Sequence, residues 1–288
     1  VTIGGDDTAY TSSQVEKEAK GKISVCHVPK TIDNDLPLPE GVPTFGFETA
    51  RELGTHLVEN LMEDAKTAAR WYFVIAMGRS AGFLALGMGT GAGATMTLIP
   101  EELGKSYSLR KVLNILEGAI IKRLSMGKDH GVAVIAEGVA ARLDPEAFSF
   151  VKDAPRDEHG NIRLAEIPFG TILKDQVSKE LKEMGIKITI VAKDIGYELR
   201  CNPPTAFDRQ YTRNLGYSAA HFLLDGGSGA MVLFKDGKTT PIPFKDLMDP
   251  KTGKTRIRTV DVKSEIFQTA RRYMIRLNPE DLEGERLA

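Results

Sequence analysis

The chain has 288 residues, of which 42% are hydrophobic and 27% charged, so it is long and apolar enough to bury a sizeable core. Its 38 basic and 39 acidic residues leave a formal net charge of −1, which argues against a nucleic-acid-binding protein. Two cysteines, Cys26 and Cys201, are too few for a disulfide framework and have no CxxC metal spacing, and they suit a reducing cytoplasm. No apolar run approaches the roughly 20 residues that span a bilayer, so we expect no membrane association.

Short apolar runs bounded by glycine, proline or charge predict strands that are buried on both faces. In chain order they are the end of a strand at Val1–Ile3, then Ile23–Val28, Trp71–Ala76, Thr95–Ile99, Val132–Ala136, Ile186–Val191 and Ala230–Phe234. Helical spacing of apolar residues predicts helices at Phe47–Arg70, Leu109–Ser125, Thr171–Met184, Ala206–Leu224 and Val262–Arg276. This alternation is typical of an α/β fold with mainly parallel sheets, in which ligands bind at the carboxyl ends of strands.

The first polar turn, Gly4-Gly5-Asp6-Asp7, follows a strand end and precedes a predicted helix. Two glycines let the backbone approach a phosphate closely, beside a helix N-terminus that favours anions. Asp6 would then hold Mg²⁺ near that phosphate, because Mg²⁺ prefers one or two carboxylates together with phosphate oxygens. An ordinary turn, with Asp6 or Asp7 as the helix cap, is an equally good interpretation of this motif alone.

A longer polar run, Pro-Lys-Thr-Ile-Asp-Asn-Asp over residues 29–35, follows the strand Ile23–Val28. In a catalytic interpretation, Asp33 takes a proton from a hydroxyl group, Asp35 supports that site, and Lys30 neutralises a transferring phosphoryl group. The alternative is a solvated turn with side-chain-to-backbone hydrogen bonds. So polar a run directly after a buried strand favours the catalytic interpretation.

Met77-Gly78-Arg79 follows the strand Trp71–Ala76 and precedes a predicted helix. A strand, a turn and a helix again form an anion site, in which Arg79 can bind a phosphate through two parallel hydrogen bonds. Arg70 lies at the opposite end of the same strand, which hints that it serves a neighbouring subunit. Either arginine can instead be a surface charge, and for Arg70 taken alone that interpretation is favoured.

Two further motifs are weaker. Glu137 ends the strand Val132–Ala136, where its carboxylate can accept hydrogen bonds from hydroxyl groups or cap the next helix. Tyr197 and Arg200 lie three residues apart, and both can reach a phosphate. The glycines of Gly87–Gly93 follow a helix and precede a strand, so we interpret them as a helix-to-strand connection and not as a dinucleotide-binding loop.

In this order the five motifs resemble the phosphofructokinase family. Gly-Gly-Asp is shared with other kinase families, but Thr-Ile-Asp-Asn-Asp at 31–35 together with Met-Gly-Arg at 77–79 is highly specific. Pro-Thr-Phe-Gly-Phe at 43–47 and Ile-Pro-Glu-Glu at 99–102 also resemble family segments. The resemblance runs from Val1 to about Gly229, and it implies Mg²⁺-dependent phosphoryl transfer to fructose 6-phosphate in glycolysis.

The resemblance also implies a role for each matching residue. Asp6 helps to bind Mg²⁺, Asp33 is the general base on the sugar 1-hydroxyl, and Arg79 steadies phosphate charge. The other residues that it implies for binding fructose 6-phosphate are Thr31, Ile32, Asp35, Met77, Gly78, Glu137, Tyr197 and Arg200. Arg70 matches an arginine that reaches the 6-phosphate across a subunit interface. A second interface arginine of the family has no clear match in this sequence, and Lys193 is the nearest cation that can take its place. A homodimer or homotetramer with shared active sites is therefore implied.

Asp7 and Lys30 bear on the phosphoryl donor. ATP-dependent members of the family usually carry glycine at both positions, so the resemblance implies pyrophosphate as the donor, bound by Gly5, Asp6, Asp7 and Lys30. One alternative is an ATP-dependent phosphofructokinase. Another is a non-catalytic regulatory subunit that senses sugar phosphates, although such a subunit would be expected to lose Asp33 or Lys30.

The family fold implies two Rossmann-like lobes, both discontinuous. We expect residues 1–44 with 199–255 to form a lobe for pyrophosphate and Mg²⁺, and residues 45–198 with 256–288 to form the lobe for fructose 6-phosphate. The family begins with a strand and a glycine-rich phosphate loop, and nothing in residues 1–288 corresponds to them. We therefore expect further protein upstream of Val1.

Overall fold

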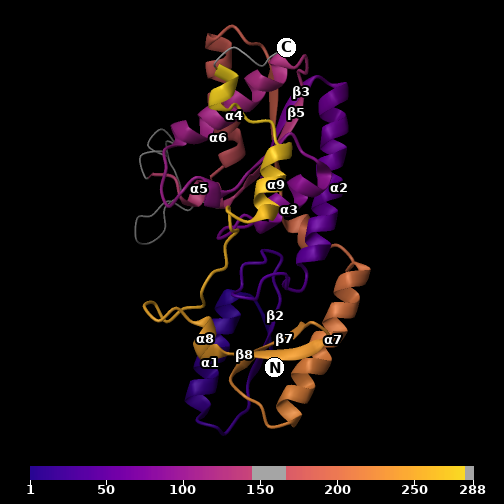
Figure 1. The fold of residues 1–288 in the computed structure, drawn as a ribbon, viewed down its shortest axis with the longest axis vertical. Coiled ribbons are helices and arrows are strands. Elements are labelled where there is room, and N and C mark those ends of the chain that lie inside the picture. The colour runs from indigo at the N-terminus through magenta and orange to yellow at the C-terminus, as the bar shows by residue number, and fades with distance from the viewer. Residues whose placement is uncertain (145–166, 283–288) are drawn as a thin grey trace. The chain divides into compact units, whose positions relative to one another are not determined.

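The computed structural model describes residues 1–144 and 167–282. It divides into two compact units, Val1–Leu53 with Glu198–Thr259 and Gly54–Tyr197 with Val260–Ala288 (Figure 1). Helix α2 (Phe47–Thr67) belongs to both units, because the boundary falls within it. Among the described residues, no helix combines the length and hydrophobicity needed to cross a membrane.

The first unit contains a four-stranded sheet in the order β1-β2-β7-β8. The strands β1 (Thr2–Gly4), β2 (Cys26–Pro29) and β7 (Ala230–Lys235) are parallel, and β8 (Lys238–Pro243) runs antiparallel to β7. Asp236 and Gly237 join β7 to β8, and their positive φ values of 50° and 74° are those of a tight hairpin turn.

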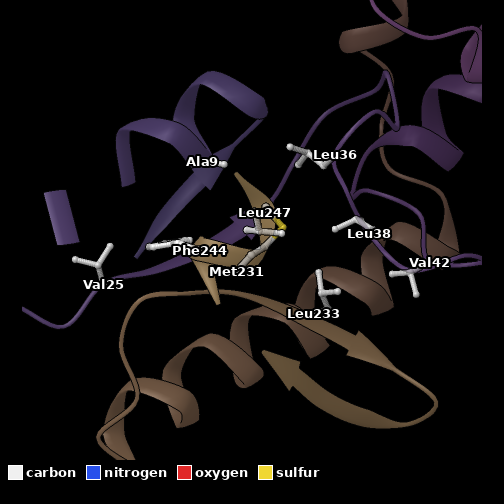
Figure 2. Packing of buried hydrophobic residues seen from close by; sticks show 9 residues of the cluster. All are labelled: Ala9, Val25, Leu36, Leu38, Val42, Met231, Leu233, Phe244 and Leu247. Atoms are coloured by element: carbon white, nitrogen blue, oxygen red, sulfur yellow. The ribbon is translucent and has the colours of Figure 1, made fainter. Parts of the chain in front are cut away.

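Alternate residues of β7 point to opposite faces of this sheet, as the period of a strand requires. Met231 and Leu233 pack with Ala9 of helix α1 (Asp6–Ala19) in a core cluster that also contains Val25, Leu36, Leu38, Val42, Phe244 and Leu247 (Figure 2). Val232 packs on the other face with residues of α7 (Ala206–Leu224). Helices α1 and α7 therefore cover opposite faces of the sheet, and its interior strands are buried.

The second unit contains a parallel sheet in the order β4-β5-β3-β6. Its strands are β3 (Arg70–Ala76), β4 (Met96–Leu98), β5 (Gly131–Ala136) and β6 (Thr189–Ile195). Its helices are α3 (Phe83–Ala92), α4 (Leu109–Ser125), α5 (Gly138–Ala141), α6 (Phe169–Glu183) and α9 (Glu265–Tyr273). Shorter elements of the described chain are α8 (Phe244–Leu247) and the 3₁₀ turns Pro100–Glu102, Tyr197–Arg200 and Pro279–Leu282.

The predicted α/β fold with mainly parallel sheets is confirmed, and helices Leu109–Ser125 and Ala206–Leu224 have the predicted bounds. The last strand of the second unit begins later than Ile186, because its pairing with β3 runs from Thr189 opposite Arg70 to Ile195 opposite Ala76. The helix predicted to reach Arg70 ends at Thr67, since Ala69 takes a left-handed φ of 48° and β3 starts directly after it.

The prediction that Gly87–Gly93 connects a helix to a strand was wrong for most of that range. Gly89 and Gly91 lie inside α3, and only Gly93, with φ 67°, ends the helix. A Cβ atom on Gly89 would collide with Oγ1 of Thr97, and one on Gly91 would lie 2.7 Å from Oγ1 of Thr55. The glycines therefore allow α3 to pack closely against its neighbours.

Two helical glycines are expected to respond in opposite ways to alanine. Gly89→Ala should lower the free energy of unfolding by about 1–3 kcal/mol, because the new methyl group overpacks the contact with Thr97. Gly216→Ala, in α7, meets no atom within 4 Å and should raise stability by up to about 1 kcal/mol through helix propensity. Urea unfolding of both variants measures this, and shifts of the same sign would contradict it.

Candidate functional site

The Gly4–Asp7 turn stands at the carboxyl end of β1. Gly4 is the last residue of that strand, Gly5 is the N-cap of α1, and Asp6 and Asp7 lie in its first turn. The side chain of Asp7 is exposed and Asp6 is half-buried. The first N–H groups of a helix lack partners within it, which is the arrangement that an anion site requires. Anion binding at this turn stays a prediction.

His27 supports this turn from the neighbouring strand β2. It is fully buried, with Nδ1 2.9 Å from Oγ1 of Thr2 and Nε2 3.1 Å from the carbonyl oxygen of Gly4. Burial lowers the pKa of His27 to about 4, so the ring is neutral at pH 7. The proton is then on Nε2, because the oxygen of Gly4 can only accept. The sequence assigned His27 no role, and only its place in a buried strand could have suggested one.

The polar run after β2 lies beside the Gly4–Asp7 turn. The backbone N–H of Lys30 donates to the carbonyl oxygen of Gly4 at 2.9 Å. A Cβ atom on Gly5 would lie 3.9 Å from Cβ of Thr31, so the two backbones pass closely. The side chain of Lys30 is exposed, and Asp33 donates its backbone N–H to Oγ1 of Thr31 at 3.1 Å. The structure thus brings the first and second motifs together.

Two residues that the sequence left without a role hold this run in an irregular conformation. Asn34 is buried in the left-handed region with φ 56°, which asparagine tolerates better than most residues. Its Oδ1 accepts the backbone N–H of Thr44 at 3.0 Å, and Oγ1 of Thr44 donates to the carbonyl oxygen of Thr31 at 2.7 Å. The resemblance of residues 43–47 to a family segment was the only signal of this contact.

The carboxylates of this site interact electrostatically. The pKa of Asp35 is raised to about 7, first by burial and then by the nearby carboxylates of Asp33 and Asp6. No group of three or more His, Cys, Asp or Glu side chains in the described part of the chain could hold a metal ion by itself. These residues therefore offer at most one or two carboxylate ligands to a divalent metal, which would complete its shell with water or phosphate oxygens.

In the second unit, three parallel strands end next to one another. The backbone N–H of Met77 donates to the carbonyl oxygen of Ile195 at 3.0 Å. The backbone N–H of Gly78 donates to Oε2 of Glu137 at 3.3 Å. Gly78 has φ 134°, a conformation that favours glycine. A Cβ atom on Gly196 would lie 3.2 Å from Cε of Met77. The third and fourth motifs and the start of the fifth therefore meet at one edge of the sheet.

The residues of this unit that are predicted to bind phosphate do not form one cluster. Arg79 and Lys193 are exposed, and Tyr197 exposes 75% of its surface. Arg70 begins β3, at the end opposite Met77, and its Nε lies 3.7 Å from Oδ2 of Asp64. Arg70 therefore lies far from the other predicted residues of its own unit.

Glu101 is a further supporting residue that the sequence noted only as part of a family segment. Its Oε1 accepts the backbone N–H of Gly82 at 2.9 Å and that of Val260 at 3.1 Å. Gly82 is the N-cap of α3 and follows Arg79 by three residues. Glu101 thus fixes the far end of the turn that carries Arg79.

The predicted site residues divide between the two units. Those in the first unit are Gly5, Asp6, Asp7, Lys30, Thr31, Ile32, Asp33, Asp35 and Arg200. Those in the second are Arg70, Met77, Gly78, Arg79, Glu137, Lys193 and Tyr197. The assignment of the donor to one unit and the sugar to the other stays a prediction.

Parallel α/β units with a Gly-Gly turn at a helix N-terminus and clustered carboxylates are typical of proteins that bind phosphate groups. The family model described as phosphofructokinase matches residues 1–223. The chain belongs to the phosphofructokinase family, which confirms the resemblance seen in the sequence.

Two similar curated proteins are each named pyrophosphate--fructose 6-phosphate 1-phosphotransferase. The one from Thermotoga maritima is 55% identical over 288 residues, covering 98% of this chain and 69% of that protein. The one from Naegleria fowleri is 50% identical, covering 99% and 68%. An ATP-dependent 6-phosphofructokinase of Mycobacterium tuberculosis is 31% identical, covering 85% and 65%. The chain thus spans about two thirds of the length of these relatives.

The fold is shared with solved structures at low sequence identity. A pyrophosphate-dependent phosphofructokinase from Nitrosospira multiformis matches with a TM-score of 0.62 and 20% identity, covering 93% of this chain and 66% of that one. Another from Marinobacter aquaeolei matches with a TM-score of 0.63 and 19% identity, covering 94% and 65%. These matches show a common fold.

We expect His27 to make the protein sensitive to acid. Between pH 6.5 and about 4 the unfolded histidine binds a proton and the folded one does not, so stability falls as the pH falls. Between these pH values the free energy of unfolding of the wild type should therefore fall by up to about 3 kcal/mol more than that of His27→Gln, whose glutamine side chain does not titrate. The raised pKa of Asp35 makes stability change with pH in the opposite direction. This effect is present in both proteins, so it cancels when the variant is compared with the wild type. Urea unfolding at several pH values measures the free energy of unfolding of both proteins. If the two free energies changed with pH in parallel, the prediction would be contradicted.

Proposed function

We propose that the chain transfers a phosphoryl group from pyrophosphate to the 1-hydroxyl of fructose 6-phosphate, forming fructose 1,6-bisphosphate and phosphate. The observation that carries this proposal is the hydrogen bond from Lys30 to Gly4, because it sets a cation-bearing loop beside an anion-binding turn. The names of the relatives at 55% and 50% identity support it. Its place would be glycolysis in the cytoplasm.

Pyrophosphate is favoured as the donor by two exposed charges, Asp7 and Lys30. Asp7 adds bulk and negative charge beside the turn, which disfavours the larger nucleotide. Lys30 supplies a cation for a compact, highly charged donor. The relative named as ATP-dependent is only 31% identical, against 55% for one named for pyrophosphate.

Asp33 would act as the general base, removing the proton of the 1-hydroxyl as that oxygen attacks in line. Its loop is held by hydrogen bonds to Thr31 and through Asn34, so the backbone that carries the carboxylate has a defined position. Lys30 and Arg79 would offset the charge that develops on the transferring group. When bound through Asp6, Mg²⁺ would supply further charge neutralisation.

The sugar would be held by the residues that the resemblance implies for it. Glu137 would accept hydrogen bonds from its hydroxyl groups, beside Met77 and Gly78. Ile32, in the first unit, is a further residue proposed to contact the sugar. Tyr197 and Arg200 would bind the 6-phosphate. A neighbouring subunit of a homodimer or homotetramer would add Arg70 and Lys193. In support, Arg70 is separated from Ala76 by the length of β3, about 20 Å, so one chain does not bring Arg70 and Met77 together.

The donor is tested by assaying the purified full-length protein with fructose 6-phosphate, Mg²⁺ and either pyrophosphate or ATP. Turnover should be faster with pyrophosphate, and Lys30→Met should lower that rate by about 10²-fold because a transition-state charge loses its partner. Lys22→Met, which removes an exposed charge before β2, serves as the control and should be near wild type. Faster turnover with ATP would reject the proposed donor, and binding of the sugar phosphate without turnover would favour a regulatory subunit.

The base is tested with Asp33→Ser, which removes the carboxylate and leaves a small polar side chain. Its kcat should fall by about 10²–10⁴-fold, with the folded structure retained by circular dichroism. Asp225→Ser, at an exposed helix end, provides the matched control. Near-normal turnover of Asp33→Ser would refute the assignment of the base.

A further inference from the structure

The side chain of Arg258 lies against the loop that carries Asp33, although 224 residues separate it from Asn34. Its Nε and Nη2 donate to the carbonyl oxygen of Asn34 at 3.1 and 2.9 Å. Its Nη1 lies 3.0 Å from the carbonyl oxygen of Val42, 3.3 Å from that of Pro39 and 3.4 Å from that of Leu38. One guanidinium therefore bridges both ends of residues 34–42.

These contacts give hydrogen-bond partners to backbone carbonyl groups of the loop. Residues 34–42 form no helix or strand, so their inward carbonyl groups lack the partners that regular structure would supply. A guanidinium offers five N–H donors in a rigid plane, whereas a lysine offers three on one flexible atom. Apolar packing holds other parts of the loop, since Leu36, Leu38 and Val42 belong to the core cluster of Figure 2.

The backbone next to Arg258 also contacts the site. Its own N–H donates to the carbonyl oxygen of Asp35 at 2.7 Å. Three residues earlier, Oγ1 of the buried Thr255 donates to the carbonyl oxygen of Asp6 at 2.8 Å. The segment Thr255–Arg258 therefore touches both the Gly4–Asp7 turn and the loop that carries the proposed base.

We propose that Arg258, aided by Thr255, is a positioning residue that sets the loop bearing Asp33 relative to the Gly4–Asp7 turn. The proposal rests on the proposed function, in which the donor binds at the turn and the base lies on the loop. Catalysis is sensitive to such alignment, because a displacement of about 1 Å can cost 10²-fold in rate. Substrate binding depends less on the same alignment.

The test compares Arg258→Lys with Arg256→Met. Arg258→Lys keeps the charge and loses the planar fork, so its kcat should fall about 10- to 100-fold with KM for pyrophosphate changed less than about 2-fold. Arg256→Met removes an exposed charge two residues away, whose side chain bonds the carbonyl group of Asp246, and should match wild type. Thr255→Val removes the hydroxyl group that bonds Asp6 and that also lies 3.9 Å from the sulfur of Met248, and it should lower kcat by a smaller factor.

Hydrogen exchange gives a second measurement that does not depend on activity. Amides of residues 31–45 should exchange faster in Arg258→Lys than in wild type or Arg256→Met, with helix α6 unchanged. If wild type turned over neither donor, the proposed function would fail and exchange alone would decide the role of Arg258.

Wild-type kcat and wild-type exchange in Arg258→Lys would overturn the proposal. So would loss of protection throughout the chain, since Arg258 would then be required for folding and not for positioning. A rise in KM with unchanged kcat would also count against it, because that pattern belongs to a substrate-binding residue.

Discussion

The hydrogen bond from Lys30 to Gly4 is the contact on which the site of the first unit depends. It continues the parallel pairing of β1 with β2 by one residue, just where both strands end. The glycine turn and the polar loop are consequently held side by side by sheet geometry. The neutral ring of His27, in β2, bonds the same carbonyl group. A residue of β2 and the residue that follows β2 therefore both hold Gly4.

Charge is the second organising feature. Asp6, Asp33 and Asp35 lie close enough for the first two to raise the pKa of the third, and burial raises it further. Such a concentration of carboxylates is unfavourable unless cations balance it. The exposed Lys30 and a bound Mg²⁺ would meet that requirement, and both would also attract a small, highly charged donor such as pyrophosphate.

The second unit uses the same architecture with different side chains. Its strands β3, β5 and β6 end together, and the side-chain carboxylate of Glu137 accepts the backbone N–H of Gly78. In both units, predicted site residues lie in irregular backbone just after parallel strands. Such backbone needs external partners for its polar groups, and Asn34, Glu101 and Arg258 supply them.

The amino-acid sequence by itself determined the family, the α/β alternation and the site motifs, because these depend on local periodicity and on short runs such as Thr31–Asp35. Strand β8 was missed, since the prolines at 241 and 243 argue against a strand and are tolerated only at an edge. The glycines within α3 were predicted to form a connection because glycine has a low helix propensity. They lie in a helix because its close packing requires small residues at these positions. Only the tertiary structure decided that His27 supports Gly4 and that Arg258 holds the loop of Asp33. Both are contacts between segments far apart in the chain, and no local pattern marks them.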